Sequence, residues 1–313
     1  MSQIAVIGAG HGGLAVAARL AVKGHQVTVY ESNHDVVTLD QVLTLPAAYR
    51  DLFLKTGSAL EDNLELAEIE TAVQIPIKDS GTLVIPGSGQ GRTLTQIAQK
   101  IGEDAESQWR TYLQQVGELW QEIRAKLVEA PLTQNLWQTI GFKNYLKFRT
   151  FSRFVNSNLK DEALQDLAEF YRTQCRVTLR TNLGLLCLNA YVQQVFGVYQ
   201  PTGGLTELTQ ALKKRCTELG VEFKFSEAVF PVEFGNQITG IESRNKKFTS
   251  CDNVIVNDLS GVLLDLNWRS KPSYETSVTG LYVINEYSWL GLGPAHAVLG
   301  ASIVAHLIGS AAD

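Results

Sequence analysis

The glycine-rich turn near the N-terminus constrains the fold more than any other feature of this chain. The segment "IAVIGAGHGGLAVAARL", residues 4–20, places Gly8, Gly10 and Gly13 in the spacing G-x-G-x-x-G. An apolar run precedes the glycines and an Ala- and Leu-rich stretch follows them, which predicts a buried strand, a tight turn and a helix. The first glycine permits the turn, the second lets the backbone approach a pyrophosphate, and the third lets the helix pack on the strand. The segment therefore predicts a phosphate-binding helix N-terminus.

A carboxylate follows the turn at the expected distance. The stretch "HQVTVYE" predicts a second strand ending at Glu31, 23 positions after Gly8. An acidic side chain there can accept hydrogen bonds from an adenosine ribose and would repel a 2′-phosphate. A glycine-rich loop in an ordinary α/β domain is the alternative, and the strand–helix–strand context argues against it. The turn alone leaves the choice between FAD and NAD open. The residues expected to contact the cofactor are Gly8, Ala9, Gly10, His11, Gly12, Gly13 and Glu31.

Composition excludes several classes of protein. The 313 residues are 45% hydrophobic, which is enough for one large or two ordinary domains. A net charge of −5 offers no basic field for nucleic acid. The four cysteines are widely spaced and the histidines show no metal-ligand spacing, so we expect reduced cysteines and no metal site. The reduced cysteines indicate a cytoplasmic protein. Because the nucleotide turn begins by residue 8, we expect no signal peptide.

The pattern along the chain predicts two interleaved parts. Alternating apolar residues on either side of Asp79-Ser80-Gly81 predict a hairpin. Apolar residues at three- and four-residue steps over 104–128 predict a long helix with Asp104 as its N-cap, and helical patterns continue to about Val195. Strand-like alternation then returns. We therefore expect an α/β fold with a discontinuous Rossmann-like dinucleotide-binding domain, residues 1–95, 196–258 and 276–313, and an inserted, mainly helical substrate or cap domain, residues 96–195.

One basic segment of the insert has two interpretations. Residues 131–160 contain five Lys and Arg side chains, no Asp or Glu, and several interleaved aromatic residues. Such a segment can bind anionic lipid headgroups, which would give a peripheral membrane contact through residues 137–160. In a single helix, however, these aromatics would spread around most of the surface. That distribution favours a core-packed helix with solvated cations.

A second segment could be mistaken for a membrane span. Residues 290–309 are uncharged apart from two histidines. Glycines stand at its start, and Pro294 suits the first turn of a helix. We expect a buried helix here.

Several stretches together resemble a known family. Residues 4–31, "DQVLTLPAAYRDLFLKTG", "FGVYQPTGGLTELTQAL", "VEFKFSEAV" and "TGLYVINEYSWLGLGPAHAVLGASIVAHLI" are similar to segments of the carotenoid (phytoene) desaturases and isomerases, among the amine-oxidase-like FAD flavoproteins. The last stretch resembles the C-terminal flavin motif of that family and favours FAD over NAD. The resemblance implies a FAD-dependent oxidoreductase, a desaturase or dehydrogenase, acting on a lipophilic isoprenoid-type substrate.

The resemblance also implies further cofactor contacts. Pro201, Gly203 and Gly204 match a P-x-G-G stretch, and Val229 stands where the family uses backbone groups to hold adenine. Glu286 replaces an Asp that lies near the ribityl chain and pyrophosphate, and Gly291 and Gly293 open the last helix. No catalytic residue is assigned. His296 is interpreted as a helix-cap or core histidine.

Departures from the family motivate a second hypothesis. The segment "SNHDVVTL" lacks the usual diglycine and Arg, Asn285 replaces a glycine, and the connection between Asn257 and Thr279 is short. The alternative is a catalytically degenerate nucleotide-binding protein that acts as a partner or regulator of a full-length flavoenzyme. A nicotinamide-dependent reductase is a third interpretation, for which no second nicotinamide-positioning region is found. The sequence leaves a homo- or hetero-oligomer open.

Overall fold

A five-stranded parallel sheet forms the centre of one half of the molecule. The computed structural model describes residues 1–36, 42–77, 81–130, 136–174, 183–258, 274–285 and 293–311. The strand order is β12-β11-β1-β2-β7, and each neighbouring pair is parallel. The strands are β1 (Gln3–Ile7), β2 (Gln26–Glu31), β7 (Glu222–Phe225), β11 (Asn253–Asp258) and β12 (Leu281–Asn285). This arrangement confirms the α/β fold.

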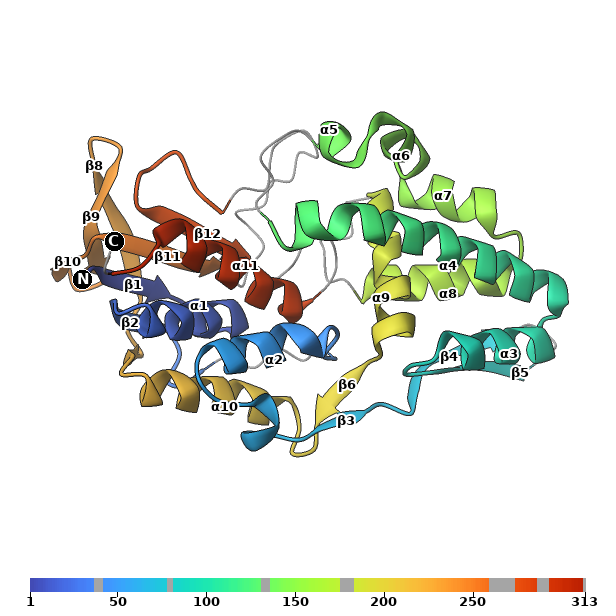
Figure 1. The fold of residues 1–313 in the computed structure, drawn as a ribbon, viewed down its shortest axis with the longest axis horizontal. Helices are drawn as coiled ribbons and strands as arrows, with labels where there is room; N and C mark the ends of the chain where they lie inside the picture. The colour runs from blue at the N-terminus through green and yellow to red at the C-terminus, as the bar shows by residue number, and fades with distance from the viewer. Residues whose placement is uncertain are drawn as a thin grey trace.

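Helices cover one face of the sheet. Alternate residues of each strand point to opposite faces, so every second residue packs against these helices. Ile4 and Val6 of β1 join the main core, which also contains residues of α1 (His11–Val22), α10 (Leu205–Glu218) and α11 (Pro294–Ile308). In Figure 1 these helices lie side by side along the sheet, with α2 (Pro46–Lys55) next to them. The carboxyl edge of the sheet is therefore bordered by helix termini.

A second, antiparallel layer covers the other face. It consists of β8 (Val229–Phe234), β9 (Gln237–Ser243) and β10 (Phe248–Ser250). Ala5 of β1 and Tyr30 of β2 pack in a smaller core with Val229 and Ile241 of this layer. Both faces of the parallel sheet are thus buried, as the continuous apolar runs of β1 and β2 predict.

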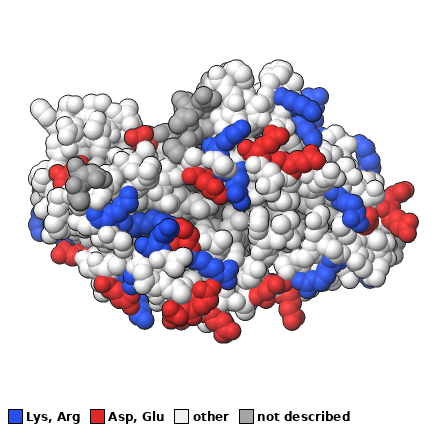
Figure 2. Space-filling model, in the orientation of Figure 1, with Lys and Arg blue, Asp and Glu red and all other residues white. Residues whose placement is uncertain are grey.

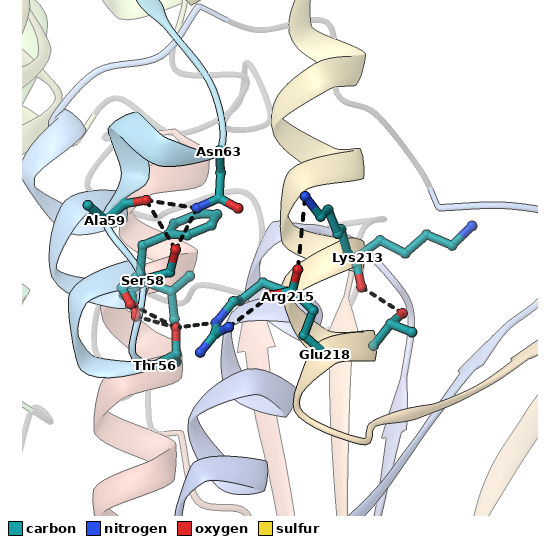
Figure 3. Close-up of polar contacts among 11 residues, drawn as sticks. Thr56, Ser58, Ala59, Asn63, Lys213, Arg215 and Glu218 are labelled. Atoms are coloured by element: carbon teal, nitrogen blue, oxygen red, sulfur yellow. Dashed lines mark hydrogen bonds and ion pairs between the residues drawn. The ribbon is translucent and has the colours of Figure 1, made fainter.

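Helix α2 is held against α10 through its C-terminal turn, which Figure 3 shows in detail. The Arg215 Nε–H donates to Thr56 Oγ1 at 3.3 Å, and Thr56 Oγ1 itself donates to the carbonyl of Leu52 at 2.9 Å. Beyond the helix, Asn63 Nδ2 donates to Ser58 Oγ at 2.8 Å. These contacts fix α2 relative to the helices that cover the sheet.

The other half of the molecule is mainly helical (Figure 1). Its elements are α3 (Gln90–Lys100), α4 (Glu103–Ile123), a π-helical turn (Arg124–Val128), α5 (Leu136–Ile140), α6 (Phe142–Lys147), α7 (Phe151–Asn158), α8 (Glu162–Thr173), a 3₁₀ turn (Gly184–Cys187) and α9 (Leu188–Phe196). Trp109, Tyr112 and Trp120 of α4 are buried in its core. The predicted long helix over 104–128 is confirmed, but it begins at Glu103 with Gly102 as N-cap, so Asp104 lies inside the first turn.

Two short antiparallel strand pairs complete the fold: one joins the two halves, and the other packs on the helical half. The pair β3 (Leu66–Glu68) and β6 (Tyr199–Pro201) joins the halves, next to a 3₁₀ turn (Leu60–Asp62). The predicted hairpin is β4 (Thr71–Ile77) with β5 (Gly81–Pro86), and its tip at Asp79 and Ser80 lies outside the described residues. The hairpin packs on α3 and α8. The division into two domains, with its boundaries near residues 95 and 196, stays a prediction.

Within residues 136–160, the basic segment forms three short helices, α5, α6 and α7, rather than one. Phe148, Phe151 and Phe154 are buried, which agrees with core packing for this part of the segment. Trp137, Phe142 and Leu146 are instead 45%, 64% and 47% exposed. The apolar segment near the C-terminus contains α11, which is buried along most of its length. Across the described ranges, no helix combines the length and the hydropathy that a membrane crossing requires.

Candidate functional site

The site begins at the point where the strand order reverses direction. From β1 the chain passes through α1 to β2 on one side, whereas β11 lies on the other side of β1. In open parallel sheets, ligands bind outside the carboxyl ends of the strands at such a reversal, because the connections on the two sides diverge there and leave a crevice. The glycine-rich turn occupies this position between β1 and β11.

The glycines of the turn are required by close backbone packing. Gly8 has a φ of 100°, which an L side chain rarely adopts, and a Cβ there would lie 2.8 Å from the carbonyl oxygen of Asn257. A Cβ on Gly13 would overlap the carbonyl oxygen of Gly8. Gly10 is the N-cap of α1, and its carbonyl accepts the Leu14 N–H at 2.9 Å. The positive end of the α1 dipole is therefore held directly above the end of β1.

The N-terminus of α11 lies beside that of α1. A Cβ on Gly12 would lie 3.1 Å from Ala297 Cβ and 2.7 Å from Ile284 Cγ2. At the far end, Lys23 Nζ donates to the carbonyl of Ala305 at 2.6 Å. The two helices are thus parallel, and both of their N-termini face the carboxyl edge of the sheet. Gly293, the N-cap of α11, has a φ of 66° that favours glycine.

Glu31 is buried at the end of β2 and supports the turn. Its Oε2 accepts the backbone N–H of Ala9 at 2.8 Å, and its Oε1 accepts the backbone and side-chain N–H groups of Asn33 at 2.9 and 2.7 Å. The carboxylate therefore links the turn to the chain that follows β2. The Ser32 hydroxyl also donates to Oε1 at 3.2 Å, so Oε1 accepts three hydrogen bonds and Oε2 accepts one. Because a carboxylate has about four acceptor positions, a ribose hydroxyl would bond to Oε2 or replace the Ser32 hydroxyl.

The chain after Glu31 is anchored to α10 by charge. Lys213 Nζ lies 2.6 Å from Asp35 Oδ1, and Gln210 Nε2 donates to Asp35 Oδ2 at 3.2 Å. The hydrogen bond from Lys213 lowers the pKa of the Asp35 carboxyl below its ordinary value. This ion pair borders the side of the turn that carries Glu31.

The His11 side chain joins three helices. It is buried, with Nδ1 2.7 Å from the hydroxyl of Tyr49 on α2 and Nε2 3.1 Å from Thr209 Oγ1 on α10. Burial lowers its pKa to about 4, so the ring is neutral at pH 7. The imidazole is therefore engaged in packing, which leaves the backbone of His11 for the predicted cofactor contact.

Two buried polar side chains stand out at the edge between the sheet and the helical half. His296, in the first turn of α11, hydrogen-bonds the backbone of Leu127, and its Nε2 has no partner among the described residues. Burial lowers its pKa to about 4, which supports the interpretation as a neutral core histidine. Asn257, at the end of β11, has no partner for either amide atom in the same described part. Sequence reasoning missed Asn257, because it reads as an ordinary residue near the end of a strand.

The remaining predicted contacts fall in different places. Val229 is buried at the start of β8, two residues after Glu227, whose N–H donates to the Glu31 carbonyl at 3.0 Å. Gly204 is the N-cap of α10, and its N–H donates to the Pro201 carbonyl at 2.9 Å. Glu286 and Gly291 lie outside the described residues. The proposed cofactor roles of these residues remain predictions.

The arrangement fits an anionic dinucleotide. Two positive helix ends at one sheet edge suit a pyrophosphate, and Glu31 lies on the β2 side for a ribose. No group of three or more His, Cys, Asp or Glu residues suited to a metal ion occurs in the described ranges. Cys216 and Cys251 are free and buried, and burial raises the pKa of the Cys216 thiol to about 12.

Comparisons with known proteins agree with this geometry. A family model of NAD(P)-binding Rossmann-like domains matches residues 6–38, and one of flavin-containing amine oxidoreductases matches residues 41–275. A 4,4'-diapophytoene desaturase of Staphylococcus aureus is 23% identical over 246 residues, which cover 72% of this chain and 49% of the relative. This chain therefore spans about half the length of the curated relatives that it matches.

Solved structures share the fold. Putrescine oxidase has a TM-score of 0.57 at 16% identity, and cyclohexylamine oxidase from Brevibacterium oxydans has a TM-score of 0.53 at 12% identity. Each match covers 82% of this chain and 57% of the other. At these identities the likeness concerns the fold alone.

Proposed function

Because this chain belongs to the flavin-containing amine oxidoreductase family, we propose that it is a FAD-dependent oxidoreductase. The observation that carries the proposal is the meeting of the α1 and α11 N-termini at the strand-order reversal, where Gly12 lies against Ala297. The family implies a flavin, and a dinucleotide with two charged phosphates uses both helix ends better than a mononucleotide. FAD is therefore the form of flavin that we propose.

In this proposal the chain binds and orients the cofactor from three sides. The α1 N-terminus with Gly10 holds the pyrophosphate, Glu31 accepts hydrogen bonds from the adenosine ribose, and backbone groups near Val229 hold the adenine. Glu286 and Gly293 contribute on the flavin side. When bound, the flavin supplies hydride acceptance from a carbon of the substrate. The chain's own tasks are placement of the substrate and exclusion of water.

We propose a lipophilic isoprenoid-type substrate, of the class that carotenoid desaturases use. The similarity to a diapophytoene desaturase supports this class. The mainly helical half, which adjoins the site through the contact of His296 with Leu127, would serve as the cap that receives the substrate. A binding site for an apolar substrate needs no charged side chain to orient that substrate, and the neutral His296 is consistent with such a site.

Anaerobic titration tests the oxidoreductase proposal. Protein loaded with FAD is mixed with a C30 or C40 carotenoid precursor in detergent, and the visible absorption band of the oxidised flavin is recorded. We expect bleaching by the precursor and its return on admission of an acceptor. Flavin uptake without bleaching by any such precursor would contradict the desaturase activity.

A second function is favoured by the sequence departures. The chain lacks the diglycine-Arg loop after Glu31 and has a short connection between Asn257 and Thr279. A nucleotide-binding partner or regulator of a full-length flavoenzyme would need neither. Co-purification with such an enzyme, together with absence of turnover by this chain alone, would favour this function. Turnover by the isolated monomer would exclude it.

We also propose that α6 contacts a lipid surface, which would bring a lipophilic substrate close to the cap. Phe142 and Leu146 are four residues apart and exposed, while Lys143 and Lys147 form the adjacent exposed row. Figure 2 shows cationic side chains at the upper edge of the molecule over α6 and α7, with acidic ones below them over α4. Apolar and cationic groups together suit anionic headgroups.

A further inference from the structure

We propose that Asn257 is a cofactor-binding residue whose carboxamide binds the flavin-side half of the dinucleotide. This inference rests on the proposed function, because it assumes that the site holds FAD. Asn257 is 4% exposed, and neither its Oδ1 nor its Nδ2 has a hydrogen-bond partner in the described part of the chain. Most buried polar side chains are hydrogen-bonded, so an amide with two unpaired atoms requires an explanation.

The position of Asn257 supplies that explanation. It lies at the end of β11, one residue after the pairing of Val256 with Ile7, and is therefore level with Gly8. Its carbonyl oxygen is the atom that a Cβ on Gly8 would meet at 2.8 Å, and its Oδ1 is 2.8 Å from the place of a Cβ on Gly12. The carboxamide thus lies against the N-terminal turn of α1, within the reversal of strand order.

The side of the site determines which half of the dinucleotide Asn257 can meet. Glu31 is on β2, on one side of β1, and Asn257 is on β11, on the other. A dinucleotide whose ribose lies at Glu31 and whose phosphates lie at α1 continues towards β11 and the N-terminus of α11. That half carries phosphate oxygens and ribityl hydroxyls. A carboxamide can donate through Nδ2 and accept through Oδ1, so one side chain can serve both kinds of group.

Substitution of Asn257 by leucine tests the proposal. Leucine has the same number and branching of side-chain heavy atoms and removes both unpaired polar groups, so we expect the melting temperature of the apoprotein to stay within a few degrees of the wild type. Loss of two hydrogen bonds, one of them to an anion, should raise the Kd for FAD by about tenfold to hundredfold. The Kd is measured by quenching of flavin fluorescence and needs no turnover. AMP, which lacks the flavin-side half, should bind the variant and the wild type equally.

Asn189 provides a matched control. It is also buried, but its Nδ2 donates to the carbonyl of Tyr171 at 2.6 Å in the helical half. Asn189→Leu should lower the apoprotein melting temperature and leave the Kd for FAD unchanged. Asn257→Asp adds a negative charge without a change of shape. Asn257→Asp should weaken FAD binding more than Asn257→Leu does, because the new carboxylate repels the flavin-side phosphate.

The outcomes separate this inference from the proposed function. If Asn257→Leu binds FAD as tightly as the wild type, or loses affinity for AMP by the same factor as for FAD, the role of Asn257 is wrong. If Asn257→Leu unfolds, Asn257→Asp decides alone: an unchanged Kd for FAD overturns the proposal. If the wild-type protein itself binds AMP but no FAD, the proposed flavin function fails and this inference fails with it.

Discussion

Gly10 and Gly13 have different roles although they share one motif. Gly10 has φ −77° and ψ −178°, an extended backbone that any residue adopts, so its lack of a side chain matters for an approaching ligand. Gly13 is enclosed by protein, because a Cβ there would overlap the Gly8 carbonyl oxygen. At position 13 glycine therefore serves packing, whereas at position 10 we propose that it serves cofactor binding.

Substitution separates these two roles. We expect Gly10→Val to abolish FAD binding while the apoprotein melts within a few degrees of the wild type. We expect Gly13→Ala to lower the free energy of unfolding by about 3 kcal/mol through overpacking. Urea unfolding and flavin fluorescence measure the two effects. Retention of FAD by folded Gly10→Val would mean that the turn is not the phosphate site.

His11 makes the stability of the fold depend on pH. Its pKa falls from 6.5 to about 4 on burial, so the unfolded chain binds a proton more readily. The free energy of unfolding should therefore decrease as pH falls from about 6.5 towards 4, by at most roughly 1.4 kcal/mol per pH unit for this residue. Above pH 6.5 the ring is neutral in both states and contributes no slope.

His11→Gln removes this titration. Urea unfolding of the variant at pH 7, 6 and 5 should give a shallower pH dependence than the wild type, even if the variant is less stable at pH 7. His296 has the same direction of shift and keeps part of the slope in the variant. An unchanged slope would show that His11 is accessible to protons in the folded protein.

At the scale of elements, local sequence patterns predicted helices, strands and the hairpin, but they did not predict which distant strands pair. The unit β1–α1–β2 and the hairpin β4–β5 follow from glycine spacing and alternation within a few residues. The pairing of Leu66–Glu68 with Tyr199–Pro201 joins segments more than a hundred residues apart, and nothing in either segment specifies its partner. The basic segment was read as one helix, whereas Gly141 with φ 78° and the extended Thr150 divide it into α5, α6 and α7.

The exposed face of α6 carries its own prediction. The double variant Phe142→Ser/Leu146→Ser should bind vesicles of phosphatidylcholine and phosphatidylserine at least tenfold more weakly, since burial of each side chain contributes about 2 kcal/mol. Because both residues are exposed, the fold should be retained. Phe234→Ser is the matched control, since Phe234 is 83% exposed on β8, and should leave vesicle binding unchanged. Equal binding by all three proteins would contradict the lipid contact.

For the whole molecule, the candidate site depends on a sheet order that no local motif contains. The glycine turn and Glu31 were predicted from the sequence because they lie within one strand–helix–strand unit. The resemblance to a flavoprotein family pointed to the C-terminal helix. The place of Asn257 depends on β11 returning beside β1 after more than two hundred residues, so only the three-dimensional structure brings it to the turn.

The central claim is that the N-termini of the parallel helices α1 and α11 together bind one FAD. The most direct measurement is a titration of the purified apoprotein with FAD, followed by flavin fluorescence and the visible spectrum, with ADP and NAD as competitors. The account predicts one FAD per chain, displaced by ADP and not by NAD. Absence of flavin uptake by folded protein, or binding of NAD in preference to FAD, would contradict it.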